Sequence, residues 1–219
     1  YEPRHGQFTP LQLDLAGDRD LREMRRTIEL LKHGGTGHIS ENKPNGWIRV
    51  MFENWNSLGI GTQSWKIDRL NYLIKHLRID ILAGCESQCD WTMVDKDNQL
   101  NALLAPGTAT KVVTAHNKTE RMQKHQAGGT AIAGIGRICD NITDTGSDHT
   151  GLGRWSWIRL GRGNTSTRII SAYLPHKPGR HSRGRTVWEQ HSRYFEARGD
   201  PRYPSTIFIE HLLNLLSQW

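Results

Sequence analysis

The chain has few cysteines, no long apolar run and no recognisable export signal. None of its segments approaches the roughly 20 consecutive apolar residues that a membrane-spanning helix needs. Residues 1–5 lack the charged-then-apolar pattern of a secretory signal. Three cysteines, Cys85, Cys89 and Cys139, form no paired disulfide framework. We therefore expect an intracellular protein, not secreted and without a membrane partner, with a nuclear location left open.

Metal-binding cysteine patterns are also scarce. Cys85 and Cys89 are separated by three residues, which could begin a zinc site. No second Cys/His pair follows at zinc-finger spacing. We interpret the two as ordinary thiols near a strand end.

The chain has a net charge of +7, and one stretch of it contains no acidic residue. Residues 171–188 contain Lys177, Arg180, Arg183 and Arg185 and no Asp or Glu. A concentrated positive charge suits a phosphate backbone or another polyanion. We predict that these four residues bind nucleic acid; a solvated basic loop is the alternative.

The length of 219 residues fits one domain with a buried core and a short appendage. Residues 1–45 are predicted to form a leader or linker with a short helix over residues 18–32, followed by a Gly-rich stretch. The domain proper is predicted to span residues 46–219.

The start of this domain has the pattern of a strand, a helix and a second strand. Residues 47–54 alternate as a strand does and end at Asn54. Ser64 can cap a helix with apolar residues at intervals of three and four, ending near Leu77. An apolar strand follows over residues 79–85 and ends at Glu86. This β-loop-α-β order is typical of α/β folds.

The rest of the domain is predicted to alternate between strands, turns and two final helices. Further strands are expected over residues 110–115, 128–135, 155–160 and 167–173, and Gly161–Asn164 is predicted to be a hairpin turn. Residues 91–124 otherwise indicate a loop. The helices are expected over residues 186–198 and, with Ser205 as cap, 205–219.

Four motifs occur in a characteristic order: Asn54 in Glu-Asn-Trp-Asn-Ser-Leu-Gly, Glu86 in Asp-Ile-Leu-Ala-Gly-Cys-Glu, Gly128-Gly129-Thr-Ala-Ile, and Tyr173 in Ile-Ile-Ser-Ala-Tyr-Leu-Pro. In these residues the chain resembles the endonuclease/exonuclease/phosphatase superfamily, which includes apurinic endonucleases, pancreatic-type deoxyribonucleases, inositol polyphosphate phosphatases and retrotransposon endonucleases. Residues 186–195 and 204–208 resemble the endonuclease region linked to reverse transcriptase in mobile elements. The resemblance covers residues 47–219.

The resemblance implies a Mg²⁺-dependent phosphodiester hydrolase acting on DNA or another nucleic acid, with Mn²⁺ as a substitute ion. Glu86 would be the principal metal ligand, and Asn54 would orient the metal shell or the phosphate. Tyr173 would hydrogen-bond the scissile phosphate. Mg²⁺ prefers such oxygen ligands and retains several waters.

Later motifs of the family are absent from these residues. No Gly-Asp-x-Asn follows the last helix. Three segments resemble the later motifs but stand at the wrong place in the order of motifs along the chain: Gly17-Asp18, Gly199-Asp200 and Ser147-Asp148-His149. We therefore expect a partial α/β sandwich, with a first sheet, flanking helices and a missing second half. One apolar sheet face would be left exposed, or covered by the missing half in cis or trans. The chain by itself would be inactive or incomplete.

Two other functions remain open at this point. One is a non-catalytic nucleic-acid-binding remnant that uses the Lys177–Arg185 loop. The other is a phosphatase acting on a small polyanion such as an inositol phosphate, which the superfamily also includes. The tail that resembles retroelement endonucleases favours a nucleic-acid substrate.

Overall fold

The computed structural model describes residues 43–59, 64–120, 126–179 and 186–219. Residues 1–42 of the predicted leader, including its helix over residues 18–32, lie outside these ranges, so both stay predictions. No helix in the described ranges is long and apolar enough to span a membrane.

The first sheet has four strands in the order β1-β2-β4-β3. The predicted β-α-β unit is confirmed, because helix α2 connects β1 to β2 and the two strands pair in parallel. β4 then runs antiparallel to both β2 and β3. The elements are β1 (Val50–Asn54), α2 (Trp65–Leu77), β2 (Ile81–Cys85), β3 (Thr110–Ala115) and β4 (Thr130–Ile135).

A second sheet of three antiparallel strands packs against the first. Its strands are β5 (Ile142–Ser147), β6 (Trp155–Leu160) and β7 (Thr167–Ala172), in that order. The predicted hairpin joins β6 to β7. Strand β5 is absent from the sequence prediction, because its sequence Ile-Thr-Asp-Thr-Gly-Ser lacks the apolar alternation that marks a half-buried strand.

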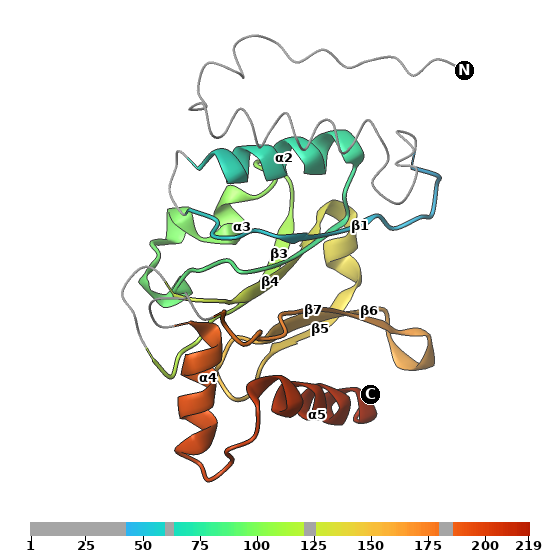
Figure 1. The fold of residues 1–219 in the computed structure, drawn as a ribbon. Coiled ribbons are helices and arrows are strands. Elements are labelled where there is room, and N and C mark those ends of the chain that lie inside the picture. Colours follow the sequence, from blue (N-terminus) through green and yellow to red (C-terminus); the bar gives the residue numbers. More distant parts are fainter. Residues whose placement is uncertain (1–42, 60–63, 121–125, 180–185) are drawn as a thin grey trace, which may run out of the picture.

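Helices cover the outer faces of both sheets (Figure 1), with α2 over the first sheet and α5 (Pro204–Ser217) under the second. Helix α4 (Val187–Glu196) stands beside α5. The predicted loop after β2 contains short helical turns and a four-residue helix, α3 (Leu100–Leu103). The order helix, sheet, sheet, helix confirms the predicted α/β class. It corrects the expectation that the chain has only the first sheet, because β5, β6 and β7 form a second one.

The expectation that the first sheet has a bare apolar face is wrong for most of that sheet. Ile81 and Ile132 of the first sheet share a buried cluster with Ile158 and Leu160 of the second. Apolar burial between the sheets is the main favourable term that holds these layers together. Among the described residues, the edge strand β1 extends beyond this cover, with Val50 48% and Phe52 56% exposed.

Two helix starts differ from the sequence prediction. Ser64 precedes α2, but its hydroxyl donates to the carbonyl of Leu58 at 2.7 Å and makes no cap hydrogen bond. Helix α5 begins at Pro204, a favourable first position because proline has no N–H to leave unsatisfied. Tyr203, and not Ser205, is the residue before it.

Candidate active site

The motif residues of the first sheet lie at one edge of that sheet. In the parallel pair β1–β2, Asn54 is the register partner of Cys85, so it is one residue away from Glu86 along the neighbouring strand. Thr130, the first residue of β4, pairs with Cys85 from the other side. The Gly128–Gly129 segment before it therefore starts at the same edge as Asn54 and Glu86.

The second sheet brings Tyr173 to this edge. The hydroxyl of Ser171 donates to the carbonyl of Gly84 at 2.8 Å, which fixes β7 over the end of β2. Two residues further on, Tyr173 approaches the Glu86 carboxylate. Burial and then the nearby Glu86 carboxylate raise the pKa of Tyr173 well above its usual value. The phenol thus remains protonated at neutral pH and can donate a hydrogen bond.

Glycine is required at the Gly128–Gly129 position. Both residues have positive φ, at +77° and +86°. A Cβ on Gly128 would lie 3.0 Å from a Val187 methyl carbon and 4.0 Å from the Tyr173 ring. The segment is therefore packed closely against Val187 and lies next to the Tyr173 ring.

The side chain of Asn54 accepts a hydrogen bond from the loop that follows it. Its Oδ1 accepts a hydrogen bond from the backbone N–H of Asn56 at 3.0 Å. This is an Asx turn, a local contact that stabilises the exit from a strand. The backbone of Asn54 thus lies beside Glu86, while its amide oxygen stabilises the loop after β1. Its role at a metal or phosphate stays a prediction.

Strained backbone gathers in the two loops after β1 and β2. Asn56, Ser57, Glu86 and Gln88 have φ between 43° and 72°, a region that side chains with a Cβ rarely adopt. Backbone hydrogen bonds join the two loops, including one from Ser57 N to Glu86 O at 2.8 Å. A strained backbone of this kind persists only where surrounding contacts hold it in place, and such residues cluster at functional sites.

Lys66 is a further residue of this site that the sequence interpretation missed. Its ammonium donates to the carbonyls of Trp55, Asn56 and Ser57 at 2.7, 2.8 and 2.8 Å. A lysine in the first turn of a helix is unfavourable, because its charge opposes the helix dipole. The position of Lys66 in the first turn of α2 is therefore the one sequence signal that could have suggested a special role for this residue. Lys66 holds the strained loop that follows Asn54.

We expect Lys66→Met to lower the free energy of unfolding by about 2 kcal/mol, because charge-assisted hydrogen bonds to three carbonyls are lost. Urea denaturation measures this. Lys75→Met, on an exposed residue at the other end of α2, is the matched control. Equal stability of the two variants would contradict a role for Lys66 in holding the loop.

The donors at this edge are oxygens and suit a hard cation. Glu86 offers a carboxylate, and no group of three or more His, Cys, Asp or Glu side chains with metal-binding geometry occurs in the described ranges. A single carboxylate of this kind suits a hard divalent cation that keeps several of its waters.

Cys85 and Cys89 are both buried thiols. Burial and then the charge of Glu86 raise the pKa of Cys85 to about 11. Burial and then the charge of Asp90 raise the pKa of Cys89 to about 12. These shifts favour the protonated thiol at neutral pH. The interpretation of the two residues as ordinary thiols stays a prediction.

A cavity of about 270 Å³ lies on the flank of the strained loops. It includes two acidic residues, Asp90 and Asp95, which disfavour a phosphate group. The lining residues are Ser57, Gly59, Ser87, Gln88, Cys89, Asp90, Met93, Val94, Asp95 and Asn98.

Of the four predicted nucleic-acid-binding residues, the structure describes only Lys177. It is exposed four residues after Tyr173, with its ammonium 5.7 Å from the centre of the Tyr203 ring. Arg180, Arg183 and Arg185 lie outside the described residues. Their contact with nucleic acid stays a prediction.

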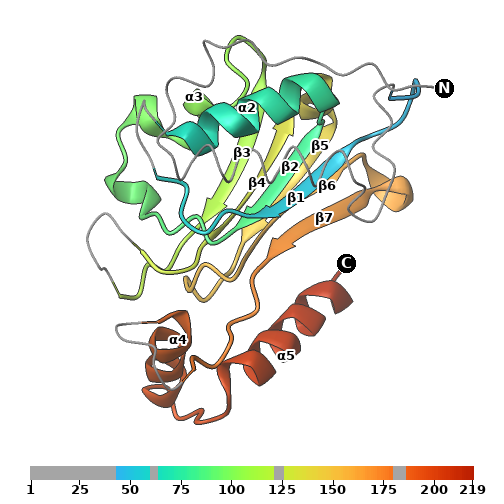
Figure 2. The same cartoon turned by 45° about the horizontal axis from the view of Figure 1, so that its top comes forward.

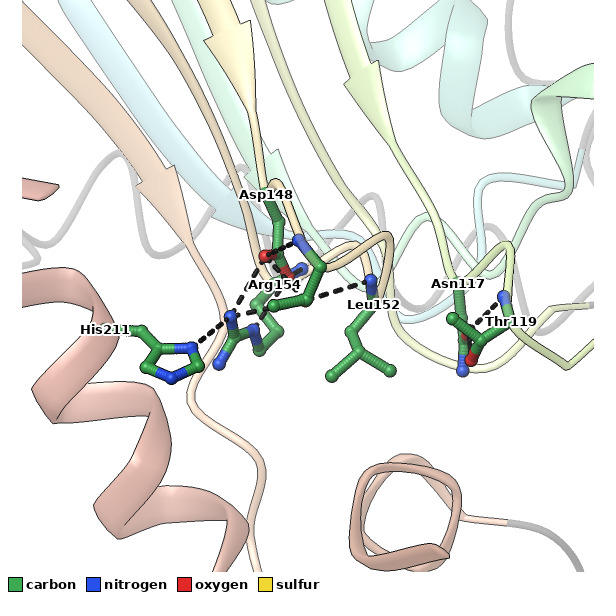
Figure 3. Close-up of polar contacts among 7 residues, drawn as sticks. Asn117, Thr119, Asp148, Leu152, Arg154 and His211 are labelled. Carbon is green, nitrogen blue, oxygen red and sulfur yellow. Dashed lines mark hydrogen bonds and ion pairs between the residues drawn. The ribbon is translucent and has the colours of Figure 1, made fainter. Parts of the chain in front are cut away.

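The family look-alikes in the described residues are structural, as predicted. Asp148 of Ser147-Asp148-His149 is buried and accepts two hydrogen bonds from the Arg154 guanidinium, at 2.7 and 2.9 Å (Figure 3). Asp200 lies at the surface and pairs with Arg202. Gly17-Asp18 lies outside the described residues.

The Asp148–Arg154 pair also supports the candidate site. The carbonyl of Arg154 accepts a hydrogen bond from the backbone N–H of Tyr173 at 2.8 Å. Its guanidinium donates to Nδ1 of His211 on α5 at 3.1 Å (Figure 3). The buried pair therefore joins α5 to the strand end that carries Tyr173. Sequence reasoning gave it no such role.

No protein-family model and no curated protein matches the chain. Among solved structures it is similar to an AP endonuclease from Archaeoglobus fulgidus, at 17% identity and a TM-score of 0.40, over 59% of this chain and 42% of that one. It is also similar to an AP endonuclease from Leishmania major, at 15% identity and a TM-score of 0.47, over 77% of this chain and 52% of that one. The chain thus spans about half the length of these proteins.

Proposed function

We propose that the chain carries the metal- and phosphate-binding part of a Mg²⁺-dependent phosphodiester hydrolase of the endonuclease/exonuclease/phosphatase type, from a retroelement. The observation that supports this best is the approach of Tyr173 to Glu86, which the Ser171–Gly84 hydrogen bond fixes. This approach brings together the ends of two strands in different sheets, beside the loop that follows Asn54. Convergence of these three predicted residues on one edge is what such a site requires.

Each residue has a role that its surroundings support. Glu86 would hold the cation, which supplies neutralisation of the charge that develops on the phosphate. Tyr173 keeps its proton, so it can donate to a phosphate oxygen, an interaction worth about 10²–10³-fold in rate at comparable oxyanion sites. Asn54 would keep the loop after β1 in place through its Asx turn.

A general base and a general acid are not supplied by the residues identified so far. The sequence contains no Gly-Asp-x-Asn, and Asp148 is committed to Arg154. Each such group contributes about 10²–10⁴-fold to a rate. We therefore propose that the chain binds a divalent cation and DNA, and that fast cleavage needs groups from a further part of the protein.

Metal binding by Glu86 is the direct test. We expect Mn²⁺, titrated by electron paramagnetic resonance as a stand-in for Mg²⁺, to bind the chain and to bind Glu86→Gln at least tenfold more weakly, because a carboxylate ligand is lost. Glu53→Gln is the matched control, since Glu53 pairs with Arg69 on α2. Equal Mn²⁺ affinity in the chain and in Glu86→Gln would refute the site.

Cleavage of supercoiled and nicked DNA in Mg²⁺ tests the proposed incompleteness. We expect no cleavage above that of the Glu86→Gln variant. Mg²⁺-dependent cleavage that Glu86→Gln abolishes would mean that the chain contains its own base, and the proposed incompleteness would be wrong.

A second candidate function is nucleic-acid binding without catalysis, which the exposed Lys177 in an acid-free loop favours. Alanine at Arg180, Arg183 and Arg185 is then expected to flatten the dependence of DNA affinity on salt. If the slope is unchanged, this loop is not the contact surface.

A further inference from the structure

A cluster of three arginines lies at the tip of the second sheet, away from the candidate site. Residues 149–188 contain eight Lys or Arg and no Asp or Glu. Arg154 is buried against Asp148, and four others belong to the loop after Tyr173. The remaining three are Arg159, Arg162 and Arg168, on β6, the hairpin and β7.

Two of these arginines face each other on the outer side of the sheet. Arg159 and Arg168 are direct register partners in the antiparallel pair β6–β7. Their neighbours Ile158 and Leu160 point into the core between the sheets, so Arg159 and Arg168 point outwards. Like charges directly opposite each other tend to destabilise a sheet.

Both guanidinium groups are held by neutral partners. Arg168 lies over the Trp219 ring, with its Cζ 4.7 Å from the ring centre, and Trp157 meets that ring edge-on at 5.1 Å. Nε of Arg159 donates to the hydroxyl of Thr143 at 3.2 Å. These contacts order the two side chains and leave their charges intact.

Carboxylates do not neutralise the cluster. Within the described ranges, no ion pair involves Arg159, Arg162 or Arg168. The nearest acid in register is Asp144 of β5, opposite Arg159, and its Oδ1 accepts from the N–H of Thr145. Asp140 also lies near the hairpin, because the carbonyl of the next residue, Asn141, accepts a hydrogen bond from the N–H of Gly161 at 2.9 Å. Three cations thus stand against two carboxylates, neither of which forms an ion pair with them in the part of the chain that the structure describes.

The arginine cluster is separate from the candidate active site. β7 runs from Thr167 at the hairpin to Ala172 beside Tyr173, and its six residues span roughly 17–20 Å. Figure 2 shows the β6–β7 hairpin at the opposite end of the sandwich from the chain that leaves β7 towards α4. A ligand at the hairpin does not occupy the Glu86 edge.

We propose that Arg159, Arg162 and Arg168, supported by Trp219, form a second contact surface for the phosphodiester backbone of nucleic acid. Guanidinium groups bind phosphate oxygens in pairs, and the planar stack on Trp219 presents one of them in a fixed orientation. A polyanion removes the repulsion between Arg159 and Arg168. The surface rests on the nucleic-acid partner of the proposed function and needs neither the metal nor catalysis.

DNA binding in EDTA tests this surface. The affinity of a labelled DNA duplex is measured by fluorescence anisotropy as NaCl rises from about 50 to about 200 mM. The double variant Arg159→Gln/Arg168→Gln is expected to bind several-fold more weakly at low salt. Its slope of log affinity against log salt should fall by about 2, since each phosphate contact contributes about 0.9.

Two control variants separate this surface from general charge. Arg159→Lys/Arg168→Lys keeps the charge and should keep the slope. Lys75→Gln/Arg78→Gln removes the same charge from the end of α2 and the residue after it, and should leave the slope unchanged. Both residues are exposed, and α2 lies over the first sheet. Circular dichroism melting confirms that each variant folds.

The outcomes are distinct. An unchanged slope in Arg159→Gln/Arg168→Gln overturns the second surface, whatever Glu86→Gln does to Mn²⁺ binding. Weaker binding to heparin together with unchanged binding to DNA also overturns it, because the partner would then be another polyanion. If Glu86→Gln leaves Mn²⁺ binding intact while the arginine variant loses its slope, the proposed catalytic site fails and the second surface stands.

Discussion

Asp148→Asn is expected to lower the free energy of unfolding by about 3–5 kcal/mol, the usual cost of removing one member of a buried ion pair. The side chains of Asp148 and Arg154 are fully buried. Burial by itself pushes the pKa of Asp148 up, but hydrogen bonds and charge from Arg154 outweigh it and hold that pKa below its usual value. Asparagine would leave the Arg154 charge buried without its counter-ion.

The loss should extend to the candidate site, because the Arg154 carbonyl holds the backbone of Tyr173. Urea denaturation gives the stability, and amide hydrogen exchange at Tyr173 reports the local effect. Asp200→Asn, in an exposed pair with Arg202, is the control and should change neither. Adding Arg154→Met should recover part of the stability, since it removes the stranded charge. A loss no larger than that of Asp200→Asn would contradict this account.

Acid is expected to destabilise the fold by about 3 kcal/mol between pH 7 and pH 4 through His191 alone. Burial, then the charge of Arg154, lowers the pKa of His191 from 6.5 to about 4. The folded state therefore binds its proton later than the unfolded state as pH falls. Stability is constant above about pH 6.5 and is lost progressively towards pH 4.

His211 acts in the same direction. Burial and then Arg154 lower its pKa, and its Nδ1 accepts from a guanidinium, which requires the neutral ring. Urea denaturation at several pH values measures the combined slope. His191→Gln should flatten this slope, whereas His176→Gln, on an exposed residue, should not. An unaltered slope in His191→Gln would assign the acid sensitivity to other groups.

Local pattern was enough to place most elements and the strand-end residues. Alternation before Asn54 and the apolar run before Glu86 predicted β1 and β2, and the helical spacing after Ser64 predicted α2. Parallel strands joined by a helix end at the same edge, so the adjacency of Asn54 and Glu86 followed from the order of elements. The strand that ends before Tyr173 was predicted in the same way.

Contacts distant in sequence could not be predicted in this way. Strand β5 has a polar sequence and exists because it pairs with β6. Its presence completes the second sheet, which covers the face expected to be bare. The Ser64 hydroxyl donates a hydrogen bond to the carbonyl of Leu58, which the fold places within reach. It therefore does not form the expected helix cap.

The sequence by itself determined which residues end the strands of this protein, because that depends on hydrophobic periodicity along the chain. Only the tertiary structure decided what those residues meet. The packing of two sheets brings Tyr173 to Glu86, the lysine of α2 reaches the loop after β1, and Asp148 pairs with Arg154 in the interior. Such contacts depend on how separate layers pack, and a one-dimensional pattern does not specify the distance between layers.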